Sequence, residues 1–133
     1  MTAKEWLSRA RRMSSRLRAL QTSKEQAYAR AVSSAAGLGE RVSGGLPADK
    51  LAAYTEVSRV VDRQVAKLEH TRAEILQVIG RIDDNTLSTL LTEYYVNDKT
   101  WAQIAAQQHY SWRQVMRLHG HALQIIRELT GLE

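Results

Sequence analysis

The stretch Lys99–Leu123, KTWAQIAAQQHYSWRQVMRLHGHAL, decides the fold that this chain is expected to adopt. It contains two capping boxes of the form Ser/Thr-x-x-Gln, one beginning at Thr100 and the other at Ser111. In such a box the first side chain and the Gln three residues later each bond the other's backbone N–H, so each box marks the start of a helix. The stretch therefore predicts two helices with only Gln107–Tyr110 between them.

This link is too short for two helices to pack antiparallel, and it suits a helix-turn-helix. Apolar residues fall where such a unit needs them to face inward: Ile104, Ala105, Tyr110, Val115 and Leu118. A small residue at Ala105 lets the two helices cross closely. We interpret the unit as a DNA-reading module.

The composition predicts an all-α protein. The chain has 133 residues with one Pro and no Phe, which suits one domain or a small domain with an extended element. The absence of cysteine excludes disulfides, thiolate zinc sites and cysteine nucleophiles. No apolar run approaches the roughly 18 residues of a membrane helix, and the N-terminus shows no signal peptide. We therefore expect a cytoplasmic protein that contacts no membrane.

The net charge of +5 is unevenly distributed. Residues 1–36 carry eight basic and two acidic side chains, whereas residues 84–133 carry four basic and five acidic ones. A basic chain favours an acidic partner such as nucleic acid. The basic excess nevertheless lies far in sequence from the predicted reading helix.

Residues 3–36 contain no Gly or Pro and predict one long amphipathic helix. Its apolar residues recur at the heptad steps of four and three, at Trp6, Ala10, Met13, Leu17, Leu20, Ala27 and Ala31. A loop is expected at about 37–47, because four of the seven glycines and Pro47 fall there.

A second long helix is predicted over residues 48–82, with the same spacing at Leu51, Tyr54, Val57, Val61, Val65, Leu68, Ile75, Ile79 and Ile82. Two such helices joined by a short loop are expected to form a long antiparallel coiled-coil hairpin, residues 1–83, for dimerisation or docking. Lys24 and Arg72 interrupt the two seams. Either they set the register or oligomeric state, or their charged ends reach solvent along the surface.

The remaining residues, 84–133, predict a three-helix module. Asp84 or Asn85 is a good N-cap for a short helix that ends near Asn97-Asp98. Its apolar positions are Leu87, Leu90, Leu91, Tyr94 and Tyr95. The two helices of the opening stretch complete the module.

Residues 90–123 resemble region 4 of sigma factors, which reads the −35 promoter element. More closely, the chain resembles a family of small phage and prophage proteins of Gram-positive bacteria. The matching residues are Ala3–Leu7, Thr100-Trp101, Ile104-Ala105, Tyr110-Ser111, Val115, Arg117–Gly120 and Ala122-Leu123. The resemblance implies sequence-specific binding of double-stranded DNA and phage transcription control, with host RNA polymerase as a candidate partner.

The chain departs from this family at three positions. Gln108-His109 stands where a Gly often precedes the Tyr, so either His109 adopts a positive φ or the turn differs. Tyr94 stands where an Arg is frequent, which removes one cation that could contact the DNA backbone. Trp6 replaces a Tyr.

If the helix from Ser111 enters the major groove, its first turns present the base contacts. The candidate DNA-binding residues are Lys99, Thr100, Ser111, Trp112, Arg113, Gln114, Met116, Arg117 and His121. Arg113 and Arg117 are the best candidates, because a guanidinium binds guanine or phosphate with two hydrogen bonds. Gln114 reads adenine if its side chain faces outward. Lys99, Thr100 and Ser111 are expected at phosphates.

Three features of the sequence leave alternatives open. The basic face of the first helix, with Arg9, Arg12 and Arg16, is either a solvated surface or a contact for DNA phosphates or an acidic protein. Trp101 is expected in the core, and the alternative is a contact with a ligand. Gly120 costs about 1 kcal/mol in mid-helix, which predicts close approach of another helix or of the DNA backbone.

We expect neither an enzyme nor a cofactor or metal site. The sequence has no Ser/His/Asp arrangement and no HExxH motif, and His119 and His121 lack the i, i+4 spacing of helical metal ligands. A helical protein-interaction protein remains the alternative to DNA binding. It would be a sigma mimic that binds polymerase or a protein resembling a small packaging-terminase subunit.

Overall fold

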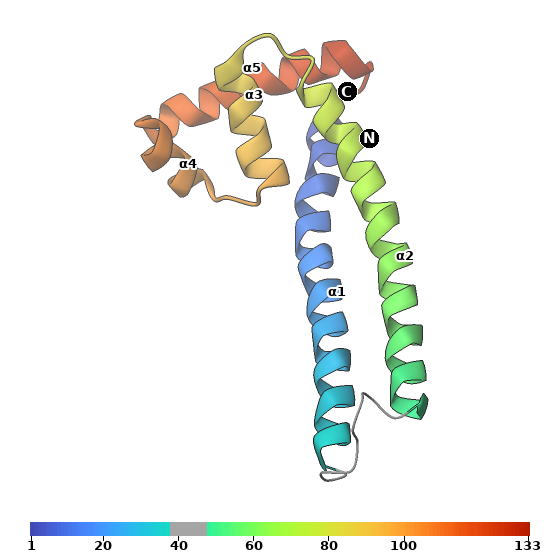
Figure 1. The fold of residues 1–133 in the computed structure, drawn as a ribbon. Helices are drawn as coiled ribbons and strands as arrows, with labels where there is room; N and C mark the ends of the chain where they lie inside the picture. Colours follow the sequence, from blue (N-terminus) through green and yellow to red (C-terminus); the bar gives the residue numbers. More distant parts are fainter. Residues whose placement is uncertain (38–47) are drawn as a thin grey trace. The chain divides into compact units, whose positions relative to one another are not determined.

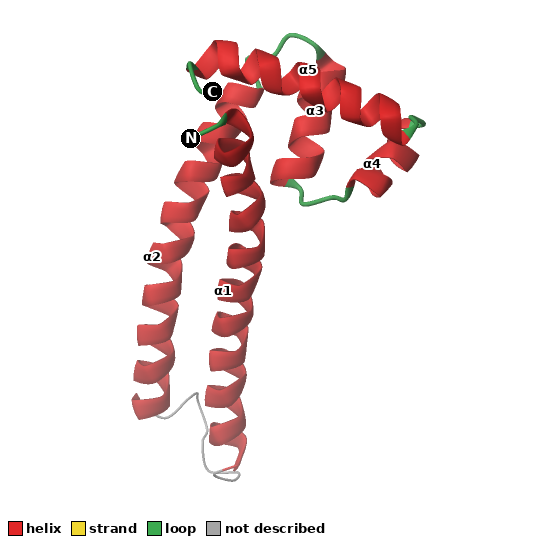
Figure 2. Ribbon diagram, turned by 180° about the vertical axis from the view of Figure 1, so that it is seen from behind, coloured by secondary structure: helices red, strands yellow, loops and turns green. Residues whose placement is uncertain are grey.

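The structure of the chain is a computed structural model, and it describes residues 1–37 and 48–133. Every regular element in these two ranges is a helix, which confirms the predicted all-α class (Figures 1 and 2). The elements are α1 (Ala3–Gly37), α2 (Ala48–Ile79), α3 (Asn85–Leu91), the π-helical turn η1 (Thr92–Val96), α4 (Trp101–Gln108) and α5 (Trp112–Thr130). The predicted loop at about 37–47 lies outside the described residues, apart from Gly37.

The described chain divides into two compact units, which we consider separately. The first unit combines Met1–Ser15 with Glu69–Glu133, and the second is Arg16–Leu68. The first turns of α1 therefore belong with the C-terminal helices, and the division does not follow the predicted boundary between residues 83 and 84.

The core of the first unit begins in α1. Ala3, Leu7 and Ala10 are fully buried, and the Ala3 N–H donates a 2.9 Å hydrogen bond to the carbonyl of Glu133. The later elements supply the rest of this core: Ile75, Ile79, Ile82, Leu87, Leu90, Leu91, Tyr95, Val96, Ile104, Val115, Ala122, Leu123 and Ile126. Burial of each Leu or Ile side chain contributes about 1.5–3 kcal/mol to the stability of the fold. This single apolar core therefore holds the first turns of α1 together with the C-terminal helices.

The helices that lead to α4 begin and end at identifiable residues. The helix α2 ends at Ile79 and not at the predicted residue 82, because the N–H groups of Arg81 and Ile82 bond carbonyls three residues back in a turn. Of the two N-cap candidates the chain uses Asp84, whose carboxylate accepts from the N–H groups of Thr86 and Leu87 at 2.9 and 3.2 Å. After α3 the helix becomes π-helical in η1, where the Asn97 N–H donates to the carbonyl of Thr92, five residues back.

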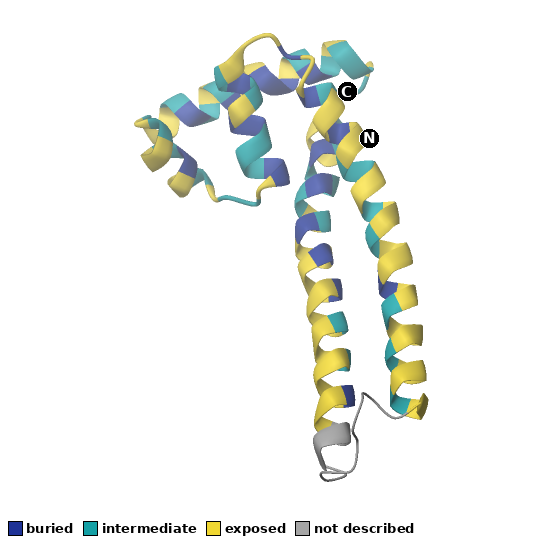
Figure 3. Cartoon of the chain, in the orientation of Figure 1, coloured by how far each residue is buried: buried dark blue, intermediate teal, exposed yellow. Residues whose placement is uncertain are grey.

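The second unit is a pair of helical segments, α1 from Arg16 and α2 up to Leu68. Polar and aromatic pairs join the two segments: Arg16 with Gln64 at 3.0 Å, Lys24 with Asp62 at 3.0 Å, and the rings of Tyr28 and Tyr54 at 5.5 Å. Their order shows that the segments run antiparallel. Of the predicted heptad positions in this unit, Leu17, Leu20, Ala31 and Val61 are buried. Figure 3 shows that most of the surface of the two segments is exposed.

Two predicted inward positions of this unit are wrong. Leu51 is 48% exposed and Val57 is 38% exposed, because a pair of helices shields only a narrow stripe on each member. Lys24, which interrupts one seam, turns its ammonium to Asp62 at the surface. Their hydrogen bond raises the pKa of Lys24. Arg72, which interrupts the other seam and belongs to the first unit, lies 3.7 Å from Glu69 on its own helix.

Nowhere in the described residues does a helix combine the length and the apolar character that a membrane crossing requires.

A chain that begins at residue 16 is expected to lose the folded first unit. The deletion removes three fully buried apolar side chains and exposes the surfaces that face them, which we estimate at about 5 kcal/mol or more, comparable with the whole stability of a small domain. Near-ultraviolet circular dichroism of the C-terminal tryptophans and urea unfolding measure the effect. A cooperative transition at the full-length midpoint would show that residues 84–133 fold without α1.

Candidate nucleic-acid interface

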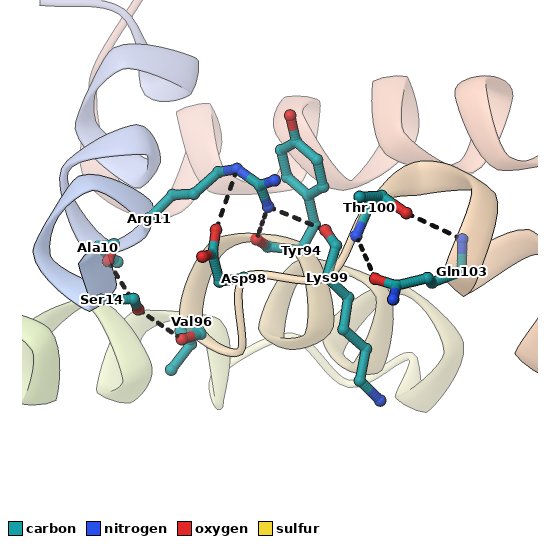
Figure 4. Close-up of polar contacts among 9 residues, drawn as sticks. All are labelled: Ala10, Arg11, Ser14, Tyr94, Val96, Asp98, Lys99, Thr100 and Gln103. Carbon is teal, nitrogen blue, oxygen red and sulfur yellow. Dashed lines mark hydrogen bonds and ion pairs between the residues drawn. The ribbon is translucent and has the colours of Figure 1, made fainter. Parts of the chain in front are cut away.

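The first predicted capping box is present at the start of α4. The hydroxyl of Thr100 accepts from the Gln103 N–H at 3.2 Å, and the Thr100 N–H donates to the Gln103 side chain at 2.9 Å (Figure 4). These bonds satisfy two backbone groups that a helix N-terminus would otherwise leave unpaired.

The turn between α4 and α5 depends on His109. This residue adopts the left-handed conformation, with φ 59° and ψ 39°, so the first of the two alternatives at this position is correct. The Tyr110 N–H then returns to the Ala105 carbonyl at 2.9 Å. Ser111 caps α5 through the second predicted box, with distances of 3.2 and 3.4 Å to Gln114. A non-Gly residue at positive φ carries a modest cost, and the closing hydrogen bond offsets part of it.

The residues predicted to face inward from α4 and α5 do so. Ile104 and Val115 are fully buried, and Ala105, Tyr110 and Leu118 pack half-buried against the same core. Their burial fixes which face of α5 remains for a partner.

The opposite face of α5 carries the predicted reading residues. Arg113, Arg117 and His121 are exposed, and Trp112 is 57% exposed. Ser111, Arg113, Gln114 and Arg117 line an open hollow at the start of the helix. The two arginines are four residues apart on α5, about one helical turn, and can therefore reach neighbouring bases or phosphates.

Two predicted contact residues are less available than expected. Met116 is half-buried and packs against the core, because its position lies at the edge of the apolar face of α5. The side-chain oxygen of Gln114 accepts the Ser111 N–H in the capping box. Adenine readout needs that oxygen and the amide nitrogen together, so the cap competes with it.

Lys99 is also engaged within the chain. Its ammonium pairs with Glu93 and donates to the Gln107 side chain at 3.0 Å. The hydrogen bond from Lys99, with a further one from Asn97, lowers the pKa of Glu93 against the opposing effect of burial. A phosphate at Lys99 would have to compete with this carboxylate.

Arg11 shapes the segment before α4. One guanidinium nitrogen of Arg11 donates to the carbonyls of Tyr94 and Lys99 at 2.6 and 2.9 Å, and Nε lies 3.5 Å from the Asp98 carboxylate (Figure 4). The guanidinium carbon stands 4.0 Å from the centre of the Tyr94 ring, in cation–π geometry. Arg11 thus fixes the loop that leads into the Thr100 cap. Nothing in its local sequence distinguishes it from the neighbouring arginines.

Ser14, one turn further along α1, has a similar role. Its buried hydroxyl donates to the carbonyl of Val96 at 2.9 Å (Figure 4). Carbonyls at the end of η1 have no hydrogen-bond donor within their own helix. For Val96, the Ser14 hydroxyl of α1 is the donor.

An aromatic cluster completes the inner side of the module. The ring of Tyr94 stacks on Trp101 at 3.7 Å, and the Tyr95 hydroxyl shares a 2.7 Å hydrogen bond with Nε2 of His119. Trp101 is half-buried against the core, as predicted. Burial lowers the pKa of His119 to about 4 and raises that of Tyr95. His119 is therefore a neutral structural residue at pH 7.

The predicted basic contacts in α1 fall in different surroundings. Arg12 is exposed and Arg9 is half-buried, both within the first unit. Arg16 is exposed in the second unit and donates to Gln64. No group of three potential metal ligands occurs within the described ranges.

Comparisons of the chain with protein-family models, with curated proteins and with solved structures found no match in any of the three. The likeness of residues 90–123 to sigma-factor region 4 and to phage proteins therefore stays a prediction.

Replacement of Arg11 by Met is expected to lower the free energy of unfolding by about 2 kcal/mol, because two carbonyls lose a hydrogen bond and the guanidinium beside the Asp98 carboxylate is removed. The matched control is Arg12→Met, at the exposed neighbouring position, with an expected change within about 0.5 kcal/mol. Urea unfolding measures both. Equal values for the two variants would rule out the bracing role of Arg11.

The stability of the first unit is expected to fall as the pH drops from about 6.5 to about 4. His119 has a lower pKa in the folded than in the unfolded chain, so the unfolded chain binds the proton more tightly. The loss from this group amounts to roughly 3 kcal/mol at most. His119→Gln keeps a hydrogen-bonding side chain beside Tyr95 and removes the titration. Urea unfolding at pH 6.5 and 4.5 is expected to show a weaker pH dependence for the variant, and an identical dependence would contradict the assignment.

Proposed function

We propose that this protein is a sequence-specific, DNA-binding transcriptional regulator of the phage or prophage type. In this proposal α4 and α5 form a sigma-region-4-like helix-turn-helix that α3 completes. The helix from Ser111 reads a promoter element in the major groove. The observation that carries the proposal is the exposed pair Arg113 and Arg117 on the face of α5 opposite its core residues. Such a regulator acts in the cytoplasm of the bacterial host and needs no catalytic residues or cofactor.

The distribution of charge around α5 supports this proposal. Between Trp112 and Arg127 the helix carries three Arg residues and no Asp or Glu. Among the acidic residues of 84–133, Asp84 caps α3, Glu93 pairs with Lys99, and Asp98 lies beside Arg11. The slightly negative total of this segment therefore does not describe the α5 face, which is positive and suits a polyanion.

The pair of helical segments in the second unit is proposed to be an antiparallel coiled-coil hairpin that forms a homodimer or docks on host RNA polymerase. A single reading helix covers few base pairs, so a second one would raise affinity and specificity. Tyr28, Val32 and Leu51 are 53%, 40% and 48% exposed, and a dimer or polymerase contact would cover them.

These exposed apolar side chains also favour a second candidate function, a helical interaction or assembly protein that does not bind DNA. A salt titration of binding to random duplex DNA separates the two. A DNA-binding face loses affinity with rising salt, because each neutralised phosphate releases counterions. Affinity for duplex that does not depend on salt would exclude the regulator proposal.

Replacement of both Arg113 and Arg117 by Ala is expected to abolish specific DNA binding, a loss of at least about 100-fold, with little effect on unfolding. Each guanidinium that contacts a base contributes about 1–3 kcal/mol of discrimination, and both side chains are exposed. Sequences selected from a random library by the unaltered protein supply the target, and fluorescence anisotropy measures the affinity.

The matched control is Arg59→Ala with Arg63→Ala, two exposed arginines at the same spacing on α2. This control is expected to bind the selected sequence as the unaltered protein does. If the two double variants lose affinity equally, α5 is not the reading helix.

A further inference from the structure

Gly120 occupies an unusual position in α5. It lies in the middle of a 19-residue helix, where glycine is destabilising relative to alanine. Apart from the two chain neighbours of Gly120 and the nearby backbone of α5 itself, no atom of the described chain comes within 4 Å of the place where a Cβ would stand. The predicted approach of another helix to Gly120 therefore does not occur within the described chain.

The glycine shares a face with the reading residues. Arg113, Arg117, Gly120 and Gln124 follow one another at steps of four, three and four, and all are exposed. His121, beside Gly120, is also exposed. On its exposed side, this piece of helix backbone without a side chain is flanked by polar residues.

The distance along the helix fits the dimensions of B-DNA. At 1.5 Å per residue, Gly120 lies about 10 Å beyond Arg113, and the major groove is about 12 Å wide. A helix whose first turn contacts bases therefore meets the sugar-phosphate strand at the groove edge near its third turn. A residue without a side chain lets that strand approach the helix most closely.

We propose that Gly120 is the point where one DNA sugar-phosphate strand packs directly against the backbone of α5, with Arg117 and His121 beside it as phosphate donors. This inference rests on the proposed function and extends the DNA contact to the third turn of the helix. A second protein helix suits this face less well, because the exposed neighbours Arg117, His121 and Gln124 are polar, and the apolar neighbour Met116 is already half-buried against the core.

The test is Gly120→Ala, which is expected to change stability and DNA binding in opposite directions. The added methyl group stabilises the helix and raises the melting temperature by a few degrees. The same methyl group would hold the DNA strand away, and affinity for the selected sequence is expected to fall about tenfold or more. Gly120→Gln, with a longer side chain, is expected to weaken binding further.

The control for a gain in helix stability is Thr89→Ala, at an exposed position of α3. It replaces a β-branched residue by alanine outside the α5 face, and is expected to raise the melting temperature without a change in DNA affinity. Calorimetry and anisotropy are measured on all variants of the full chain.

Unchanged affinity in Gly120→Ala, while Arg113→Ala with Arg117→Ala abolishes binding, would overturn this inference and leave the proposed function standing. Absence of DNA binding by the unaltered protein would overturn both. Loss of self-association in Gly120→Ala without weaker DNA binding, measured by sedimentation, would assign Gly120 to a contact between two copies and overturn the DNA contact.

Discussion

The candidate interface depends on the contacts that the guanidinium of Arg11 makes. This group binds two carbonyls and lies beside a carboxylate in the segment that ends at the Thr100 cap, and it covers the ring of Tyr94. A helix end that turns sharply leaves its carbonyls without partners, and Arg11 bonds those of Tyr94 and Lys99. The first turns of α1 are therefore part of the same compact unit, although about eighty residues separate them from the loop that they hold.

This interaction changes the meaning of the basic N-terminal segment. From the sequence, the basic side chains of residues 1–36 form either a solvated surface or a contact for DNA phosphates or an acidic protein. In the structure their partners differ. Arg11 bonds backbone carbonyls of the first unit. Lys24 and Arg16 bond side chains of α2, whereas Arg12 is exposed. The net charge of a segment is thus a poor guide to the electrostatic potential at its surface, because ion pairs within the protein neutralise charges of both signs.

The aromatic and imidazole groups on the core side of α5 hold this helix in a fixed position. His119 is neutral and buried beside Tyr95, and Trp101 stacks on Tyr94 above the start of α4. A reading helix transmits specificity only if its side chains are held in place. The cluster holds α5 from its core side and leaves Arg113, Arg117 and Gly120 at the surface.

The sequence alone determined the local features, because caps and turns depend on residues a few positions apart. Both capping boxes, the inward positions Ile104 and Val115, the all-α class and the start of α1 at Ala3 follow from short-range patterns. Only the tertiary structure decided that Arg11 and Ser14 complete the loop before α4, and that Met116 packs inward. It also decided that Leu51 and Val57 remain exposed. Those outcomes depend on which surfaces meet across many residues of chain, and heptad spacing does not specify how wide a stripe a neighbouring helix covers.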